Sequence, residues 1–134
     1  MLAALAWPRH VRHHRAVAWF SDHAPAAWGT APITQAGFIR VSSNRRVLPD
    51  ARSPGEAAGV LRAMTDLAGH ELWLDDVDLV RECAGTFDRL RGYRQVTDAH
   101  LLAVAARHHG RLVTFDAAVA DLTEDRARVT VLRL

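Results

Sequence analysis

Lysine is absent from this chain, and all 17 basic residues are arginine. Together with the abundance of alanine, this bias is typical of a GC-rich coding sequence, so the number of arginines is no evidence by itself for phosphate binding. The net charge is only +2, which does not single out nucleic acid as a partner. A functional site must therefore be sought in the placement of particular residues.

Cysteine is nearly absent as well. Cys83 stands alone, so no internal disulfide can form, and a reducing cytoplasm is the expected location. No apolar run approaches the roughly 20 residues that cross a membrane. The apolar segment 1–7 has no basic start and is followed at once by Pro8, which indicates a helix and not a secretion signal. We expect no membrane partner.

A glycine-rich phosphate loop is missing, which argues against a general α/β phosphate-binding domain. Internal repeats and low-complexity tails are also missing. The 134 residues, 49% of them hydrophobic, suffice for one core. We therefore predict a single domain over residues 1–134.

Helical patterns alternate with short apolar runs. The clearest helix start is Ser53-Pro54-Gly55-Glu56, where Ser and Glu form a capping box around a proline in the first turn. Helices are predicted at 1–6, 10–23, 35–42 (capped by Thr34), 54–68, 75–87 (capped by Asp75 or Asp76) and 97–109, and strands at 30–33, 71–74, 112–115 and 128–132. This order predicts an α/β fold with a parallel sheet covered on both faces.

Two carboxylates stand out in the stretch QVTDAHLLAVAARHHGRLVTFD, from Gln95 to Asp116. Asp98 falls in the first turn of a predicted helix, on the face that carries Leu102. Asp116 follows a predicted strand directly, and sites in parallel sheets form at the carboxyl ends of strands. Inward carboxylates are costly unless they are paired or bound to a cation, and Mg²⁺ is bound by one or two carboxylates plus water and phosphate oxygens. A plainer alternative stays open, in which Asp98 is a helix-terminal residue and Asp116 a turn former.

The same stretch, VTDAHLLAVAARHHGRLVTFD, resembles the carboxy-terminal motif of PIN-domain ribonucleases of the VapC family, found in type II toxin–antitoxin systems. TAPITQAGFIRVSSN, from Thr30 to Asn44, resembles a second block of that family, and LAALAWPRHVRHHRAVAWF resembles its first helices. The three blocks follow in the right order and cover nearly the whole chain. The resemblance implies a three-layer α/β/α PIN-like domain.

The resemblance also implies a site. In this family three or four acidic residues surround Mg²⁺ or Mn²⁺, and Asp98 and Asp116 match two of them as metal ligands and catalytic residues. Thr114 matches a small polar position that supports the site. Gln35 stands where the family usually has Glu, and an amide supplies no charge. Gln35 is either a weak catalytic ligand or a helix-start residue that faces solvent.

One departure concerns the front of the domain. The family's first acidic residue ends an apolar, central first strand, whereas this chain begins inside the helix that follows it. We expect the sheet to lack that strand, either because the true start lies several residues upstream or because the member is short and impaired.

The function implied by the resemblance is metal-dependent endoribonuclease activity, with a homodimer and a small VapB-type antitoxin as expected partners. Five arginines flank the predicted site in sequence and are candidates for RNA binding: Arg40, Arg45, Arg46, Arg91 and Arg94. Their alternative reading is ordinary surface arginine. A second function of a different class is a non-catalytic RNA-binding or partner-binding module, because the first acid is missing and Gln35 replaces Glu.

Overall fold

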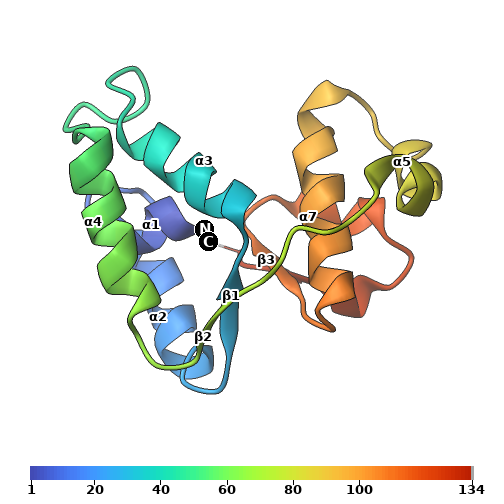
Figure 1. Cartoon of the computed structure of the whole chain (residues 1–134), viewed down its shortest axis with the longest axis horizontal. Helices are drawn as coiled ribbons and strands as arrows, with labels where there is room; N and C mark the ends of the chain where they lie inside the picture. Colours follow the sequence, from blue (N-terminus) through green and yellow to red (C-terminus); the bar gives the residue numbers. More distant parts are fainter. Residues whose placement is uncertain (134) are drawn as a thin grey trace. The chain divides into compact units, whose positions relative to one another are not determined.

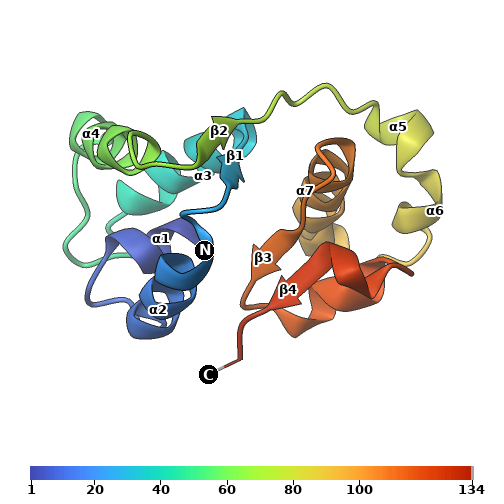
Figure 2. The same ribbon diagram turned by 90° about the horizontal axis from the view of Figure 1, so that it is seen from below.

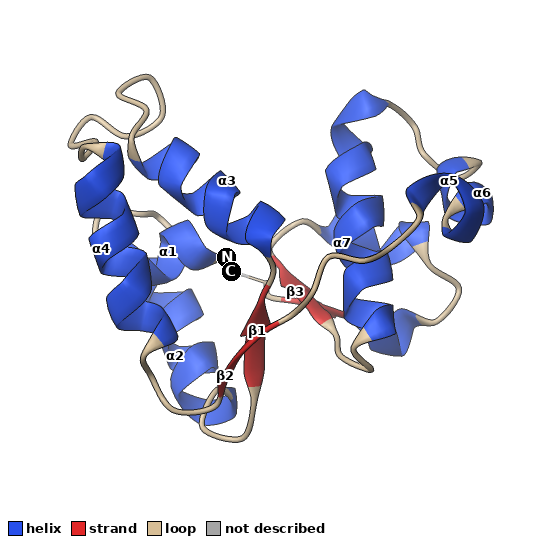
Figure 3. Cartoon of the chain, viewed as in Figure 1, coloured by secondary structure: helices blue, strands red, loops and turns tan. Residues whose placement is uncertain are grey.

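The computed structural model describes residues 1–133 and divides into two compact units, Met1–Leu74 and the segment from Asp75 onward (Figures 1 and 2). Each unit contains one two-stranded parallel sheet together with helices (Figure 3). The predicted mixed α/β class with parallel strands is therefore confirmed. The three-layer arrangement, the missing strand and the single domain remain predictions.

The first unit contains four helices and one strand pair. The helices are α1 (Leu2–Ala6), α2 (His13–His23), α3 (Pro32–Ser42) and α4 (Pro54–Thr65). Strand β1 (Trp28–Thr30) runs parallel to β2 (His70–Leu72), with Trp28 opposite His70. Helix α3 packs against α4, and α1 packs against both α2 and α3.

Aromatic side chains hold this unit together at two places. The Trp7 ring stacks on Phe38 with 6.1 Å between centroids, and its Nε1 donates to Oγ of the fully buried Ser42 over 2.9 Å. On β1, a Cβ added to Gly29 would lie 2.4 Å from the indole of Trp73. Glycine is therefore required at position 29, because the ring occupies that space.

Local signals explain both the correct and the wrong boundaries here. The capping box of α4 is confirmed, since Ser53 Oγ accepts from Glu56 N and Glu56 Oε2 accepts from Ser53 N. The strand predicted at 30–33 is wrong in position: β1 ends at Thr30, and α3 begins at Pro32. Proline at the first helical position and a bond from Ala31 N to Thr34 Oγ1 start the helix earlier than expected.

The second unit is built around one long helix and a second strand pair. Its elements are α5 (Leu79–Glu82), α6 (Ala84–Phe87), the 3-10 turn η1 (Tyr93–Gln95), α7 (Val96–Arg107), β3 (Leu112–Thr114), the 3-10 turns η2 (Ala117–Leu122) and η3 (Arg126–Arg128), and β4 (Val129–Val131). Strand β3 runs parallel to β4, with Leu112 opposite Val129. The core centres on Leu102, Val119 and Leu122.

The single helix predicted from Asp75 to Phe87 is wrong. Two short helices, α5 and α6, flank a break at Cys83, whose backbone leaves the helical region at φ −111° and ψ 10°. The N-cap of α5 is Asp78, in place of the predicted Asp75 or Asp76, and Val80 is 80% exposed. In the turn at the end of α7, His109 has a positive φ of 53°.

Candidate active site

Asp98 lies in the first turn of α7, where the sequence pattern placed it. The 3-10 turn η1 leads directly into α7 through helical backbone at Gln95 and Val96. Ala99 and Leu102 are buried on the inward face of the helix, and Asp98 itself is half-buried at the edge of that face. The helix therefore holds this carboxylate near its positive dipole end without exposing it fully to water.

Asp116 lies two residues after the end of β3. Its backbone N–H donates to Thr114 Oγ1 over 3.1 Å, and its Oδ1 accepts from Ala118 N over 2.9 Å as the N-cap of η2. Thr114 is anchored in turn, because its carbonyl accepts from Leu132 N over 2.8 Å. Thr114 thus orients the backbone of Asp116, and the cap bond to Ala118 N fixes its carboxylate through Oδ1.

The two carboxylates influence each other electrostatically. Burial, followed by the negative charge of Asp116, raises the pKa of the Asp98 carboxyl above its ordinary value. Both causes disfavour the charged form of Asp98. Since α7 and β3 bring these groups close enough to interact, the metal-free pair carries an electrostatic penalty that a divalent cation would relieve.

A second pair of side chains, His100 and Asp75, ties α7 to the first residue of the second unit. His100 Nε2 lies 2.6 Å from Asp75 Oδ1, and the two side chains are only 13% and 23% exposed. Further along, Arg107 bonds Glu82 over 2.5 Å. The sequence had suggested Asp75 as a helix cap and had given His100 no role. No local signal could have found this pair, because 25 residues separate its members.

Gln35 belongs to the first unit, in the first turns of α3. Its Nε2 donates to Thr30 Oγ1 over 3.0 Å, and the same hydroxyl lies 2.9 Å from His70 Nε2. Thr30 is buried at 2% exposure, so the amide of Gln35 is held by a protected partner at the end of β1 and does not simply face solvent. Its role beside the acidic pair remains a prediction.

The arginines predicted to contact RNA are all on the surface. Arg40 is in the last turn of α3, and Arg45 and Arg46 follow in the next loop. Arg91 and Arg94 are exposed just before α7, in the same unit as the acidic pair. Their contact with RNA also remains a prediction.

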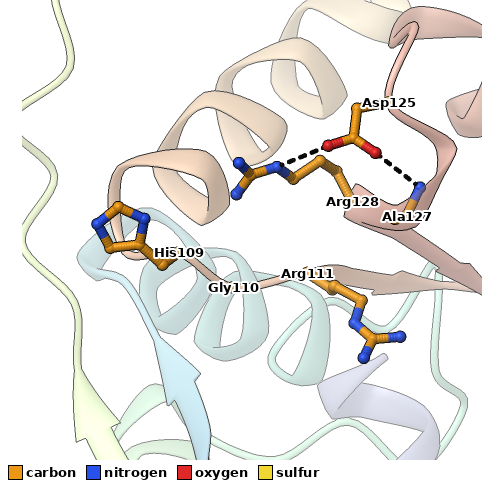
Figure 4. Close-up of a pocket in the computed structure, with 6 residues that line it drawn as sticks. All are labelled: His109, Gly110, Arg111, Asp125, Ala127 and Arg128. Carbon is orange, nitrogen blue, oxygen red and sulfur yellow. Dashed lines mark hydrogen bonds and ion pairs between the residues drawn. The ribbon is translucent and has the colours of Figure 1, made fainter.

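Two surface hollows occur in the second unit, and neither is lined by a predicted site residue. The larger is shown in Figure 4, where Asp125 accepts from Ala127 N and Arg128 Nε beside His109 and Arg111. The second is lined by Cys83, Leu102 and neighbouring residues. Neither of these two hollows contains Asp98 or Asp116.

Within residues 1–133 no group of three or more His, Cys, Asp or Glu side chains is arranged to hold a metal ion. Two carboxylates are nevertheless a sufficient donor set for Mg²⁺, which keeps several waters and uses substrate phosphate oxygens. Asp98 and Asp116 would supply two such carboxylates, and their binding of a metal ion remains a prediction. No helix among these residues is long and apolar enough to span a bilayer.

Comparison with known proteins identifies the family. A model of the PIN domain matches residues 1–125. Ribonuclease VapC39 of Mycobacterium tuberculosis is 52% identical over 121 residues, which cover 90% of this chain and 87% of that protein. Ribonuclease VapC38 of the same organism is 47% identical over 130 residues, covering 97% and 90%, and Ribonuclease VapC44 is 40% identical over 120 residues, covering 90% and 84%. The resemblance found in the sequence is thus confirmed, and the chain belongs to the PIN-domain family, among the VapC ribonucleases.

Proposed function

We propose that this chain is a Mg²⁺- or Mn²⁺-dependent endoribonuclease and the toxin of a VapBC-type toxin–antitoxin pair. The observation that carries the proposal is the Asp98–Asp116 pair, in which burial and the charge of Asp116 raise the pKa of Asp98. A half-buried carboxylate beside a second one is an unfavourable arrangement unless a cation completes it. Family membership supplies the reaction class, which is cleavage of RNA.

In the proposed mechanism Asp98 and Asp116 hold the divalent ion and Thr114 keeps Asp116 in place. When bound, the ion would neutralise charge on the scissile phosphate and lower the pKa of a water molecule. Asp98 binds a proton more readily than an ordinary aspartate, so a proton and a cation compete for it. Water is the proposed nucleophile: its oxygen forms the new bond to phosphorus, one phosphorus–oxygen ester bond breaks, and the leaving oxygen takes up a proton to become a hydroxyl on the second RNA fragment.

The partners follow from the family and are proposed on that basis. They are an RNA substrate, a VapB-type antitoxin that blocks the site, and a second copy of the chain in a homodimer. Arg91 and Arg94 are proposed to bind the RNA backbone, as are Arg40, Arg45 and Arg46. The family match over residues 1–125 supports a single functional domain. A cytoplasmic location is proposed from the relationship to VapC ribonucleases.

Cleavage of RNA by purified protein tests the proposal. Asp98→Asn keeps the shape of the side chain and removes its charge, so Mg²⁺-dependent cleavage should be lost. Asp88→Asn is a matched control, because Asp88 is an exposed aspartate of the same unit at the end of α6. Cleavage by Asp98→Asn at the rate of the unmodified protein would refute the assignment.

One observation favours a second candidate, a non-catalytic binding module. Residues 1–133 present no group of three ligating side chains, and Gln35 supplies an amide where the family motif usually has a carboxylate. Calorimetric titration with Mn²⁺ separates the two candidates. Absence of binding at millimolar Mn²⁺ would favour the module, and binding that Asp98→Asn removes would favour the nuclease.

A further inference from the structure

The turn that precedes α7 presents an exposed aromatic side chain between two arginines. Tyr93 is 81% exposed, and Arg91 and Arg94 beside it are exposed as well. The other two aromatic residues of the second unit, Phe87 and Phe115, are half-buried. Tyr93 contributes little to the core at such exposure, yet a large aromatic side chain is a favourable contact surface for a ligand.

The backbone around Tyr93 is held in shape before any ligand arrives. Gln95 Oε1 accepts from Arg91 N over 2.8 Å, and Gln95 N donates to the carbonyl of Gly92 over 3.1 Å. These two bonds close residues 91–95 into a compact turn with Tyr93 within it. A binding group on a closed turn loses less conformational entropy when it is immobilised than one on an open loop.

The Arg94 side chain contacts Tyr93 near the hydroxyl end of the ring, where Arg94 Nε donates to the Tyr93 hydroxyl over 3.5 Å. The Arg94 guanidinium carbon lies 5.9 Å from the centroid of the Tyr93 ring. Arginine over an aromatic ring is a stable cation–π arrangement and leaves guanidinium N–H groups for phosphate. The turn therefore combines an aromatic surface with charge for a backbone, which is how proteins hold single-stranded nucleic acid.

The position of the turn relates it to the acidic pair. Tyr93 precedes Asp98 by five residues along continuous helical backbone, which corresponds to a rise of about 8–10 Å. At roughly 3.4 Å per stacked nucleotide, that is a separation of a few nucleotides. Five residues of helix also rotate about 140° beyond one full turn, so the two side chains point to different sides of the helix start, and an RNA that meets both must cross that end of the helix.

We infer that Tyr93, with Arg94, forms a stacking platform for an unpaired base of the RNA substrate, close to the bond that is cut. The inference rests on the proposed nuclease function, because it takes RNA as the ligand. RNA is favoured over a protein ligand by the contact of Arg94 with the ring and by the exposed Arg91 two residues before it. The platform accepts any base, since every base has a π-face, and it requires that base to be unstacked from a duplex.

Binding is measured by fluorescence anisotropy without divalent ions, so that no RNA is cut. The probes are a labelled single-stranded RNA of mixed sequence, about 15 nucleotides long, and a blunt duplex of the same length. Tyr93→Ala should weaken single-strand binding roughly 5- to 150-fold, and Tyr93→Phe should bind nearly as well as the unmodified protein. Val80→Ala is the matched control, because Val80 is 80% exposed in the same unit.

Salt dependence separates stacking from charge. Tyr93→Ala should leave the slope of log K against log salt unchanged, whereas Arg94→Gln should reduce it by about 0.7. In cleavage assays Tyr93→Ala should raise KM with little change in kcat. The melting temperature should not change, because the side chain is mostly exposed.

Several results would overturn the inference. These are single-strand binding by Tyr93→Ala that matches Val80→Ala, an equal loss of binding to the duplex, or a loss by Tyr93→Phe as large as by Tyr93→Ala. Unchanged RNA binding with weakened binding of an antitoxin would also overturn it and assign Tyr93 to a protein contact. If the unmodified protein binds RNA through Tyr93 without cutting it, the nuclease proposal fails and the platform stands. If it cuts RNA and Tyr93→Ala leaves KM unchanged, the platform fails and the nuclease stands.

Discussion

Replacing Asp98 with asparagine should stabilise the metal-free protein and abolish its stabilisation by Mg²⁺. The substitution keeps the side-chain shape and removes a half-buried charge that faces the charge of Asp116. The pair is partly exposed to solvent, so screening limits the relief in metal-free protein to about 1 kcal/mol or less. For a domain of this size that corresponds to a rise in melting temperature of about 3–5 °C at most.

Stabilisation by Mg²⁺ should exceed the effect of the substitution in metal-free protein, and Asp98→Asn should lose this stabilisation. At ten times its Kd, an ion that binds only the folded state adds about 1.4 kcal/mol, or about 4–7 °C in melting temperature. The unmodified protein should show this rise in Mg²⁺ relative to EDTA. Asp98→Asn should show almost none, because one of the two proposed carboxylate ligands is gone.

Thermal unfolding in EDTA and across a MgCl₂ series measures both effects. Asp88→Asn should behave like the unmodified protein in both conditions, since Asp88 is an exposed carboxylate at the end of α6. A clear fall in the EDTA melting temperature of Asp98→Asn would show that the charge is not a penalty. An undiminished Mg²⁺ response would show that Asp98 is not a ligand.

Three further predictions concern pH, the support of α7 and the first unit. Because the pKa of Asp98 is raised in the folded state, the folded state binds that proton more tightly than the unfolded one. The contribution of Asp98 to the free energy of unfolding is therefore present at low pH and is lost as pH rises through the raised pKa. In EDTA, Asp98→Asn should lack this decline. An identical dependence of stability on pH for both proteins would contradict the prediction. Asp75→Asn should lower the free energy of unfolding by about 1–3 kcal/mol, because it weakens the bond to the mostly buried His100. Asp76→Asn should lower it by about 0.5 kcal/mol or less, because only an exposed ion pair is lost. Equal losses for the two variants in denaturant titrations would refute the distinction. Gln35→Glu should increase Mg²⁺ affinity in calorimetric titration, since it restores the carboxylate usual at this position of the motif, and unchanged affinity would remove Gln35 from the metal site.

Much of the local structure could be predicted because its causes are local. The capping box at Ser53 and Glu56 starts α4 as expected, and the amphipathic pattern before Gly110 located α7. The break at Cys83 could not be predicted in the same way. The spacing of the apolar residues suggested a continuous helix, but Cys83, Gly85 and Thr86 are weak helix formers, and α5 and α6 contain no buried residue that would support a longer one.

The same distinction between local and tertiary causes applies to the candidate site. The sequence identified Asp98 and Asp116 from a helix start and a strand end, and their mutual influence follows from one helix-to-strand turn. It gave Tyr93 no role, because exposure and the stacked Arg94 are visible only once the turn is closed by Gln95.

The sequence by itself determined the family, the two acidic residues and the elements that carry them, because each depends on residue types at short spacing. The tertiary structure decided which distant groups meet. It paired Asp75 with His100, tied Gln35 to the buried Thr30, and left Val80 and Tyr93 in solvent. These outcomes depend on how whole elements pack against one another, and residue spacing along the chain does not encode that packing directly.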